Sequence, residues 1–259
     1  MKYVVLVPDG AADYPQDSLG GRTPLQAAHT PAMDRLAAEG VNGLVSVIPA
    51  GRPPGSDVGN LEVFGYDSLV AYTGRAPLEA ASMGVALPDD AVAFRCNLIH
   101  RDGDTLVDYS AGHISTAEGQ ELVRLLAARL GDGRTSFHPG VQYRHLAVLR
   151  HASDRTKAYP PHDIMGQSVQ AHLPAGDGAE RVRALMAAAE PVLAEAAVNR
   201  ARAAAGHLTA NAIWLWGCGR AAPLEPMARR YGVRGGVISA VDLVRGIGLA
   251  AGLEVIQVP

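Results

Sequence analysis

Short apolar runs near both ends of the chain determine the architecture that its sequence predicts. Residues 3–7 (YVVLV) are apolar without alternation, which is typical of a strand buried on both faces of a sheet, and residues 211–216 (NAIWLW) predict a second buried strand. Residues 41–48 and 253–258 are predicted to form two further strands. Because helical segments follow these strands, the pattern predicts an α/β fold with a mostly parallel sheet flanked by helices.

Local signals predict where several helices begin and end. Thr23 and Thr30 each precede a proline, the arrangement of an N-cap followed by proline at the first helical position. The second of these is predicted to begin a helix that ends at Gly40. Residues 178–205 are rich in alanine and predict one long helix that is notched at Pro191.

The middle of the chain has a different pattern. Residues 91–99 and 105–108 are predicted to form an antiparallel hairpin around an Asp-Gly-Asp turn. Ser115 and Glu118 have the spacing of a capping box at the start of a helix. Residues 141–149 predict another strand.

These differences predict a division into domains. The chain has 259 residues, which is long enough for one domain that carries an inserted second domain. We therefore predict an inserted α+β domain over residues 90–175, and a main domain formed by residues 1–89 and 176–259.

Composition narrows the class of protein. The net charge of −3 does not indicate a surface that binds nucleic acid or an anionic membrane. No apolar run reaches the length that spans a bilayer. The apolar run at the N-terminus is too short for the core of a signal peptide. Only Cys96 and Cys218 could form a disulfide, and neither has the spacing of a zinc site. We expect an unanchored cytoplasmic protein.

The Pro53-to-Asp67 loop holds the first candidate for chemistry. Ser56 lies between Gly55 and Asp57 where a helix is predicted to begin, and a helix N-terminus favours phosphate. An N-cap serine after a surface turn explains the same pattern. Asp9 follows the first predicted strand, where α/β sheets place ligands, but a turn aspartate fits equally well.

Two other features are interpreted as structural. Gly217-x-Gly219-Arg220 follows a predicted strand but lacks the third glycine and the downstream acid of a dinucleotide-binding motif. Trp214 and Trp216 lie on one face of that strand, and we interpret both as core residues rather than a stacking platform.

Taken together, the loops resemble a known family, the archaeal-type cofactor-independent phosphoglycerate mutases of the alkaline phosphatase superfamily. The segments that carry the resemblance are residues 8–10, 53–67, 72–80, 94–98, 108–115, 143–145, 160–164, 213–220 and 235–247. The resemblance implies an alkaline-phosphatase-like fold and a glycolytic and gluconeogenic isomerase. Such an enzyme interconverts 3-phosphoglycerate and 2-phosphoglycerate through a phosphoserine intermediate. It uses two divalent metal ions (Mn²⁺, Mg²⁺ or Zn²⁺) and no 2,3-bisphosphoglycerate.

The resemblance also implies roles for particular residues. Ser56 is expected to accept the phosphoryl group, and Asp9 and Ser56 are expected to be metal ligands. Cationic and polar side chains in the inserted domain and in the segment before it are expected to bind the phosphoglycerate, since arginine binds carboxylate and phosphate bidentately. These candidates are Arg75, Arg95, His113, Arg144, His145, His162 and Asp163.

One departure from the family leaves alternatives open. Members of the family continue well beyond the position that matches Pro259, and the further metal ligands lie in that continuation, so we expect a truncated chain that is inactive in isolation. The chain is then part of a phosphoglycerate mutase, or a catalytically silent binding or complementation module, or part of a related metal-dependent phosphatase or phosphotransferase. A homo-oligomer and a complementing C-terminal half both stay open as partners.

Overall fold

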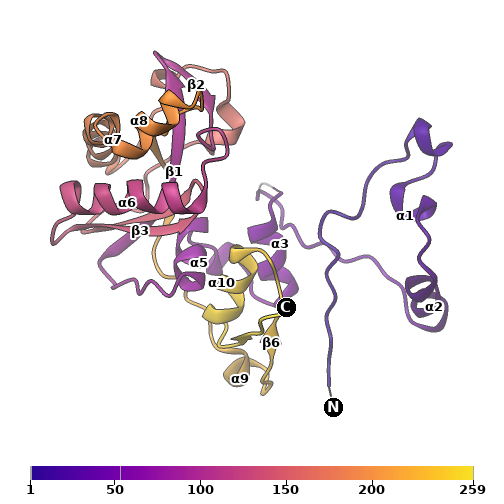
Figure 1. Cartoon of the computed structure of the whole chain (residues 1–259). Helices are drawn as coiled ribbons and strands as arrows, with labels where there is room; N and C mark the ends of the chain where they lie inside the picture. Colours follow the sequence, from indigo (N-terminus) through magenta and orange to yellow (C-terminus); the bar gives the residue numbers. More distant parts are fainter. Residues whose placement is uncertain (1, 53, 259) are drawn as a thin grey trace. The chain divides into compact units, whose positions relative to one another are not determined.

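The computed structural model of the chain describes residues 2–52 and 54–258 and divides into two compact units. The units are Met1–Gly59 and Asn60–Pro259 (Figure 1). Pro53, with which the predicted Ser56 loop begins, lies outside the described residues, as does Pro259.

The first unit consists of short helices joined by extended loops. Its elements are η1 (Asp17–Leu19), α1 (Pro24–Ala27), α2 (Pro31–Glu39) and the start of α3 (Ser56–Val63). Both predicted helix starts are confirmed: Pro24 and Pro31 are the first helical residues, and Thr23 forms a capping box with Gln26.

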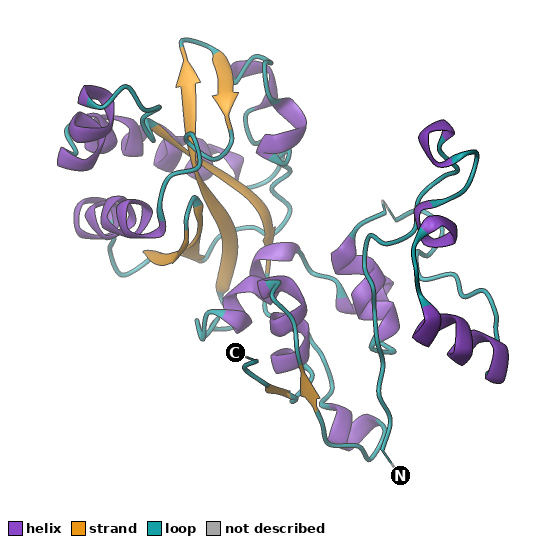
Figure 2. Ribbon diagram, turned by 45° about the vertical axis from the view of Figure 1, so that its right-hand side comes forward, coloured by secondary structure: helices purple, strands orange, loops and turns teal. Residues whose placement is uncertain are grey.

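The two strands predicted in this unit were wrong. Residues 3–7 and 41–48 have no regular secondary structure, and the side chains of Leu6 and Leu44 are 81% and 104% exposed. Figure 2 shows only helices and loops in this part of the chain. A strand needs a neighbour to take its backbone hydrogen bonds, and no strand is present among the described residues of this unit.

An antiparallel sheet forms the centre of the second unit. Its strands are β1 (Ala91–Asp102), β2 (Thr105–Asp108), β3 (Thr135–Val141), β4 (Arg144–Arg150) and β5 (Ala212–Gly219). The order is β2-β1-β4-β3, and β5 also pairs with β1. The predicted hairpin is confirmed, because β1 and β2 pair antiparallel around the turn at Asp102 and Thr105.

This sheet differs from the expected one in its direction. All of its pairings are antiparallel. They include the pairing of β1 with β5, although residues 211–216 were predicted to belong to a mostly parallel sheet. The parallel pairing among the described residues is that of β6 (Gly236–Val237) with β7 (Glu254–Val255). The strand predicted over 253–258 is therefore shortened to two residues. The protein has a mixed α/β fold in which the main sheet is antiparallel.

Two helices pack against this sheet: α6 (Thr116–Leu130) against β3 and α7 (Ala179–Ala194) against β5 (Figure 1). A third helix, α8 (Ala197–Ala204), packs against both α6 and α7. The predicted capping box is confirmed, since the Ser115 hydroxyl accepts from the backbone N–H of Glu118. Phe94 and Cys96 of β1 belong to the same core cluster as Leu122 of α6. Because successive side chains along a strand point to opposite faces, Arg95 points to the opposite face of the sheet from its two neighbours.

The long helix predicted over 178–205 is broken in two. The break lies at Glu195 and Ala196, whereas Pro191 lies within α7. Asn199 donates side-chain hydrogen bonds to the carbonyl oxygens of Leu193 and Ala210, so it pairs a carbonyl at the end of α7.

A second core lies around two short helices. Further elements of the unit are α4 (Ser68–Ala71), α5 (Arg75–Ser82), η2 (Pro161–Ile164), η3 (Gln170–His172), α9 (Met227–Arg230) and α10 (Asp242–Ala250). Leu78 of α5 packs with Leu243 and Ile247 of α10. A Cβ atom on Gly246 would lie 1.8 Å from the carbonyl oxygen of Leu78, so only glycine permits this close approach.

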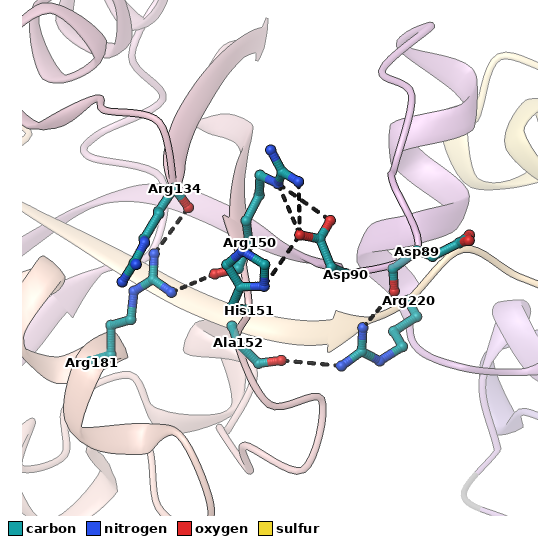
Figure 3. A network of polar contacts seen from close by, with 8 residues as sticks. All are labelled: Asp89, Asp90, Arg134, Arg150, His151, Ala152, Arg181 and Arg220. Atoms are coloured by element: carbon teal, nitrogen blue, oxygen red, sulfur yellow. Dashed lines mark hydrogen bonds and ion pairs between the residues drawn. The ribbon is translucent and has the colours of Figure 1, made fainter.

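Arginine side chains fasten the chain where it enters and leaves the sheet (Figure 3). Arg220, which follows β5, donates to the carbonyl oxygens of Asp89 and Ala152 at 2.8 and 3.2 Å. Asp90, which precedes β1, accepts hydrogen bonds from both Nε and Nη2 of Arg150 on β4, and Oδ2 of Asp90 lies 3.3 Å from Nδ1 of His151. The hydrogen bonds from Arg150 keep the pKa of the Asp90 carboxyl below its usual value. These contacts fix one end of β1 against the ends of β4 and β5.

Two further observations concern domains and membranes. The strand β5 lies outside the inserted domain predicted over residues 90–175, but it pairs with β1, which lies inside that domain. The domain boundaries predicted at residues 90 and 175 stay a prediction. Among the described residues, no helix is both long and apolar enough to cross a lipid bilayer.

Candidate functional site

Two arginines share one carboxylate at the junction of α5 and β1. The Nε atom of Arg75 lies 3.0 Å from Oε1 of Glu79, one helical turn along α5. The Nε atom of Arg95, on β1, lies 2.8 Å from Oε2 of the same side chain. The Arg95 and Glu79 side chains are only 6% and 11% exposed, so the charges are largely removed from water.

A glycine allows α5 to begin beside the sheet. Gly74 immediately precedes the helix and has a φ of 148°, and a Cβ atom there would lie 2.1 Å from the carbonyl oxygen of Cys218 on β5. Thr73 donates a hydrogen bond to the carbonyl oxygen of Arg220 at 2.7 Å. The first turn of α5, which carries Arg75, is therefore held against the end of β5.

The indole ring of Trp216 lies beneath both arginines. The guanidinium carbon of Arg95 is 4.5 Å from the ring centroid and that of Arg75 is 6.0 Å away, both within range of a cation–π interaction. Trp216 Nε1 donates to Oδ1 of Asn97 at 3.0 Å, which fixes the orientation of the ring. The ring of His162 approaches Trp216 edge-on, with centroids 5.6 Å apart.

Two tyrosines extend this group of side chains. The Tyr109 ring makes edge contacts with the rings of Tyr143 and His162, at centroid distances of 5.4 and 6.0 Å. The Arg144 guanidinium lies 5.3 Å from the centroid of Tyr143. The backbone carbonyl of Tyr109 accepts a hydrogen bond from the side chain of Asn97, so the aromatic group is joined to β1.

The pairing of β1 with β4 decides which residues join this cluster. Asn97 pairs with Arg144 and Cys96 pairs with His145. Cross-strand partners share a face of the sheet, and neighbours along a strand point to opposite faces. Arg144 therefore lies on the face of Arg95, whereas His145 lies on the face of Cys96, toward the core beneath α6.

His145 is buried in that core. Its Nδ1 accepts a hydrogen bond from the backbone N–H of Gly140 at 2.9 Å, and its Nε2 makes no hydrogen bond with any residue that the structure describes. Burial lowers the pKa of His145 to about 4, opposed in part by the nearby backbone of Gln142. The structure does not bring His145 to the arginines, and its contact with substrate stays a prediction.

His113 lies on a turn with unusual backbone geometry. Ala111, Gly112 and His113 have φ values of 51°, 66° and 52°, all in the left-handed region. Such a conformation costs about 1–3 kcal/mol for a residue with a side chain and is often found at functional sites. The turn is held by Arg202, which donates to the carbonyl oxygen of Ala111, and by Ser110, whose hydroxyl accepts from His113 N–H. The predicted role of His113 stays a prediction.

Charge in the cluster is predominantly positive. Arg75 and Arg95 share the single carboxylate of Glu79, and Arg144 adds a third positive charge near Arg95. Burial lowers the pKa of Arg95, and the Glu79 carboxylate opposes this effect. Burial also lowers the pKa of His162, while Asp163, whose carboxylate lies 3.7 Å away, raises it. The site therefore offers at least three cations to an anion, and a histidine biased toward its neutral form.

Asp9 and Ser56 both belong to the first unit. Asp9 lies in a turn in which Ala11 N–H donates to the carbonyl oxygen of Pro8, and Ser56 is the first residue of α3. Within residues 2–52 and 54–258, no three histidine, cysteine, aspartate or glutamate side chains gather as a metal-binding group. The assignment of Asp9 and Ser56 as metal ligands stays a prediction.

The sequence interpretation missed two residues at the centre of the cluster. Trp216 is buried, as predicted for a core residue, but it also carries both arginines on its ring. Glu79 was not singled out. Its spacing of four residues from Arg75 was the available signal, because side chains at that spacing meet on a helix.

Comparison with known proteins identifies the family. The sequence model of 2,3-bisphosphoglycerate-independent phosphoglycerate mutase matches residues 37–199. The chain is 53% identical to a probable 2,3-bisphosphoglycerate-independent phosphoglycerate mutase from Geobacter sulfurreducens. It is 51% identical to the 2,3-bisphosphoglycerate-independent phosphoglycerate mutase from Methanosarcina acetivorans. Both alignments cover 100% of this chain and 66% of the relative, so the chain spans about two thirds of their length.

Two solved structures are similar to this chain over most of its length. A Pyrococcus horikoshii protein is 28% identical, with a TM-score of 0.75, over 96% of this chain and 59% of that protein. The cofactor-independent phosphoglycerate mutase from Thermoplasma acidophilum is 27% identical, with a TM-score of 0.60, over 96% of this chain and 68% of that enzyme. This chain therefore belongs to the family of 2,3-bisphosphoglycerate-independent phosphoglycerate mutases.

Proposed function

We propose that the protein carrying this chain interconverts 3-phosphoglycerate and 2-phosphoglycerate through a phosphoserine at Ser56. The observation that carries the proposal is the cluster of Arg75, Arg95 and Arg144, which matches a substrate with a carboxylate and a phosphoryl group. The names of the relatives, at about half identity over the whole chain, support the same reaction.

The proposed reaction has two balanced half-reactions. Ser56 Oγ forms a bond to phosphorus while the bond from phosphorus to O3 of the glycerate breaks, and the serine proton ends on O3. The hydroxyl at O2 then attacks the phosphoserine, the bond to Oγ breaks, and a proton returns to the serine. The arginines hold the glycerate between the two transfers, and His162 helps to orient it. The phosphoryl group taken from O3 returns to O2 of the same glycerate and the serine ends unphosphorylated, so no 2,3-bisphosphoglycerate is needed as a phosphoryl donor.

The position of Ser56 suits the role of phosphoryl acceptor. It begins α3, and the first N–H groups and the dipole of a helix stabilise a phosphate there. Two divalent metal ions, when bound, would supply the charge that activates a serine hydroxyl, and we infer that Asp9 and Ser56 contribute ligands to them. Which of Mn²⁺, Mg²⁺ or Zn²⁺ is used depends on the complete ligand set.

Several broader inferences accompany this function. We infer that the complete enzyme has an alkaline-phosphatase-like fold. We infer that residues 90–175 form the inserted substrate-binding domain and that the enzyme works in the cytoplasm, where Cys96 and Cys218 stay reduced. The two cysteines are unpaired in the structure, which agrees with a reducing compartment.

Turnover of 3-phosphoglycerate, coupled to enolase, tests the proposal. The protein carrying this chain should convert 3-phosphoglycerate to 2-phosphoglycerate in the presence of Mn²⁺ without added 2,3-bisphosphoglycerate, and Ser56→Ala should abolish conversion. Release of inorganic phosphate without isomerisation would identify a phosphatase instead. Binding of 3-phosphoglycerate without any turnover would identify a binding module.

A further inference from the structure

We propose that Glu79 is a positioning residue that sets the guanidinium groups of Arg75 and Arg95 above Trp216 so that together they bind one oxyanion group of the substrate. The inference rests on the proposed function for the identity of the substrate, but the geometry and its test concern anion binding alone.

Glu79 contacts the two arginines through their Nε atoms. Its two carboxylate oxygens each face the Nε of a different arginine, at 3.0 and 2.8 Å. The Nη groups of Arg75 and Arg95 make no hydrogen bond with the residues that the structure describes. Each guanidinium therefore keeps its terminal N–H donors, the atoms that bind carboxylate or phosphate bidentately.

The Arg95 guanidinium is held firmly before any ligand binds. Arg95 is fixed on one side by the Glu79 carboxylate and on another by the face of the Trp216 ring. The ring is itself fixed by its hydrogen bond to Asn97, a neighbour of Arg95 on the same face of β1. The Nε–H of Arg95 is not aligned for a hydrogen bond with Glu79, so the pairing of these two side chains is mainly electrostatic. A long, flexible side chain is thus restricted to one orientation before any ligand arrives, which lowers the entropy cost of binding.

The Glu79 carboxylate does not neutralise the arginines around it. Arg75 and Arg95 carry two positive charges against the single charge of Glu79, and Arg144 adds a third positive charge near Arg95. If Glu79 served only to balance charge, its removal would strengthen the attraction for an anion. If Glu79 sets the geometry, its removal weakens anion binding although the site becomes more positive. The two roles predict changes of opposite sign.

Trp216 provides a direct readout. The chain has two tryptophans, both on β5, so Trp214→Phe leaves Trp216 as the sole reporter beneath the arginines. Inorganic phosphate and glycerate serve as separate probes of the phosphoryl and carboxylate groups. In the Trp214→Phe protein, we expect saturable quenching of Trp216 emission by at least one of them, and the tighter probe shows which group the pair binds.

Two variants of Glu79 separate charge from geometry. Glu79→Gln keeps the shape and removes the charge, whereas Glu79→Asp keeps the charge and shortens the side chain. We expect both to weaken binding of the tighter probe by about tenfold or more, because charge-assisted hydrogen bonds are lost when the donors are misaligned. Glu190→Gln is the matched control, since it removes the carboxylate of another ion pair, 2.6 Å from Arg101, and should leave binding unchanged.

Circular dichroism establishes that the variants compared are folded. If Glu79→Gln does not fold, Glu79→Asp carries the test. The proposal is overturned if Glu79→Asp binds the probe as tightly as its parent, or if Glu79→Gln binds it more tightly. Normal anion binding in a protein without mutase turnover would reject the proposed function and leave this inference standing. Mutase turnover with unaffected Glu79 variants would reject this inference alone.

Discussion

Replacing His145 with asparagine should change how the stability of the protein depends on pH. The folded-state pKa of His145 is about 4, because the ring is buried beneath α6, whereas an exposed histidine has a pKa near 6.5. Asparagine places an acceptor near the position of Nδ1, so the hydrogen bond from Gly140 N–H can persist while the titrating group is lost.

The magnitude follows from the two pKa values. Above pH 6.5, His145 is neutral in the folded and unfolded states and the free energy of unfolding does not depend on its titration. Between pH 6.5 and 4, the unfolded state binds a proton that the folded state does not, so stability falls as the pH falls. Each pH unit costs 1.36 kcal/mol, so the whole interval costs about 3 kcal/mol. Below pH 4 both states are protonated and the loss is complete.

Urea unfolding followed by tryptophan fluorescence measures this effect. Both tryptophans lie on β5, so their emission reports on the unit that contains the sheet. The difference in unfolding free energy between the parent and His145→Asn at pH 7 gives the cost of altered packing. That difference should shrink by about 3 kcal/mol as the pH falls to 4. Parallel pH profiles for the two proteins would show that the ring titrates normally and is not buried as described.

Two further predictions concern the arginine cluster and the second core. Arg144→Ala should raise the KM for 3-phosphoglycerate, because losing a charge-assisted contact costs about 1.5–3 kcal/mol, whereas Arg124→Ala on the exposed side of α6 should leave steady-state kinetics unchanged. Gly246→Ala should lower the free energy of unfolding by about 1–3 kcal/mol, because its Cβ would meet the Leu78 carbonyl. Gly133→Ala, where a Cβ meets nothing within 4 Å, should change it by less than about 0.5 kcal/mol, and equal unfolding midpoints for the two variants would refute the close contact.

Local signals predicted the helices of this protein better than its sheet. The capping boxes at Thr23 and Ser115 act within one turn of chain, so the sequence alone determines them. The direction of β5 depends on its pairing with β1, more than a hundred residues away, and an apolar run does not encode that partner. This is why residues 211–216 were correctly predicted as a buried strand but placed in a parallel sheet.

The candidate site shows the same limit. Resemblance to the family supplied Arg95 and Arg144, and the sheet brings them to one face. His145 was grouped with Arg144 because both lie in a segment that resembles the family, although neighbours on a strand point to opposite faces. That alternation was available once residues 141–149 were predicted as a strand. The role of Trp216 was not available, because it depends on the register between β1 and β5.

Detection of the phosphoenzyme tests whether Ser56 carries the phosphoryl group during the reaction. The protein carrying this chain is mixed with 3-phosphoglycerate and Mn²⁺, quenched in acid, digested and analysed by mass spectrometry. The account predicts a phosphoryl group on the peptide that contains Ser56, formed within the time of one turnover, and neither phosphopeptide nor isomerisation in Ser56→Ala. Isomerisation at the parental rate by Ser56→Ala, or a phosphoryl group on a different residue, would contradict it.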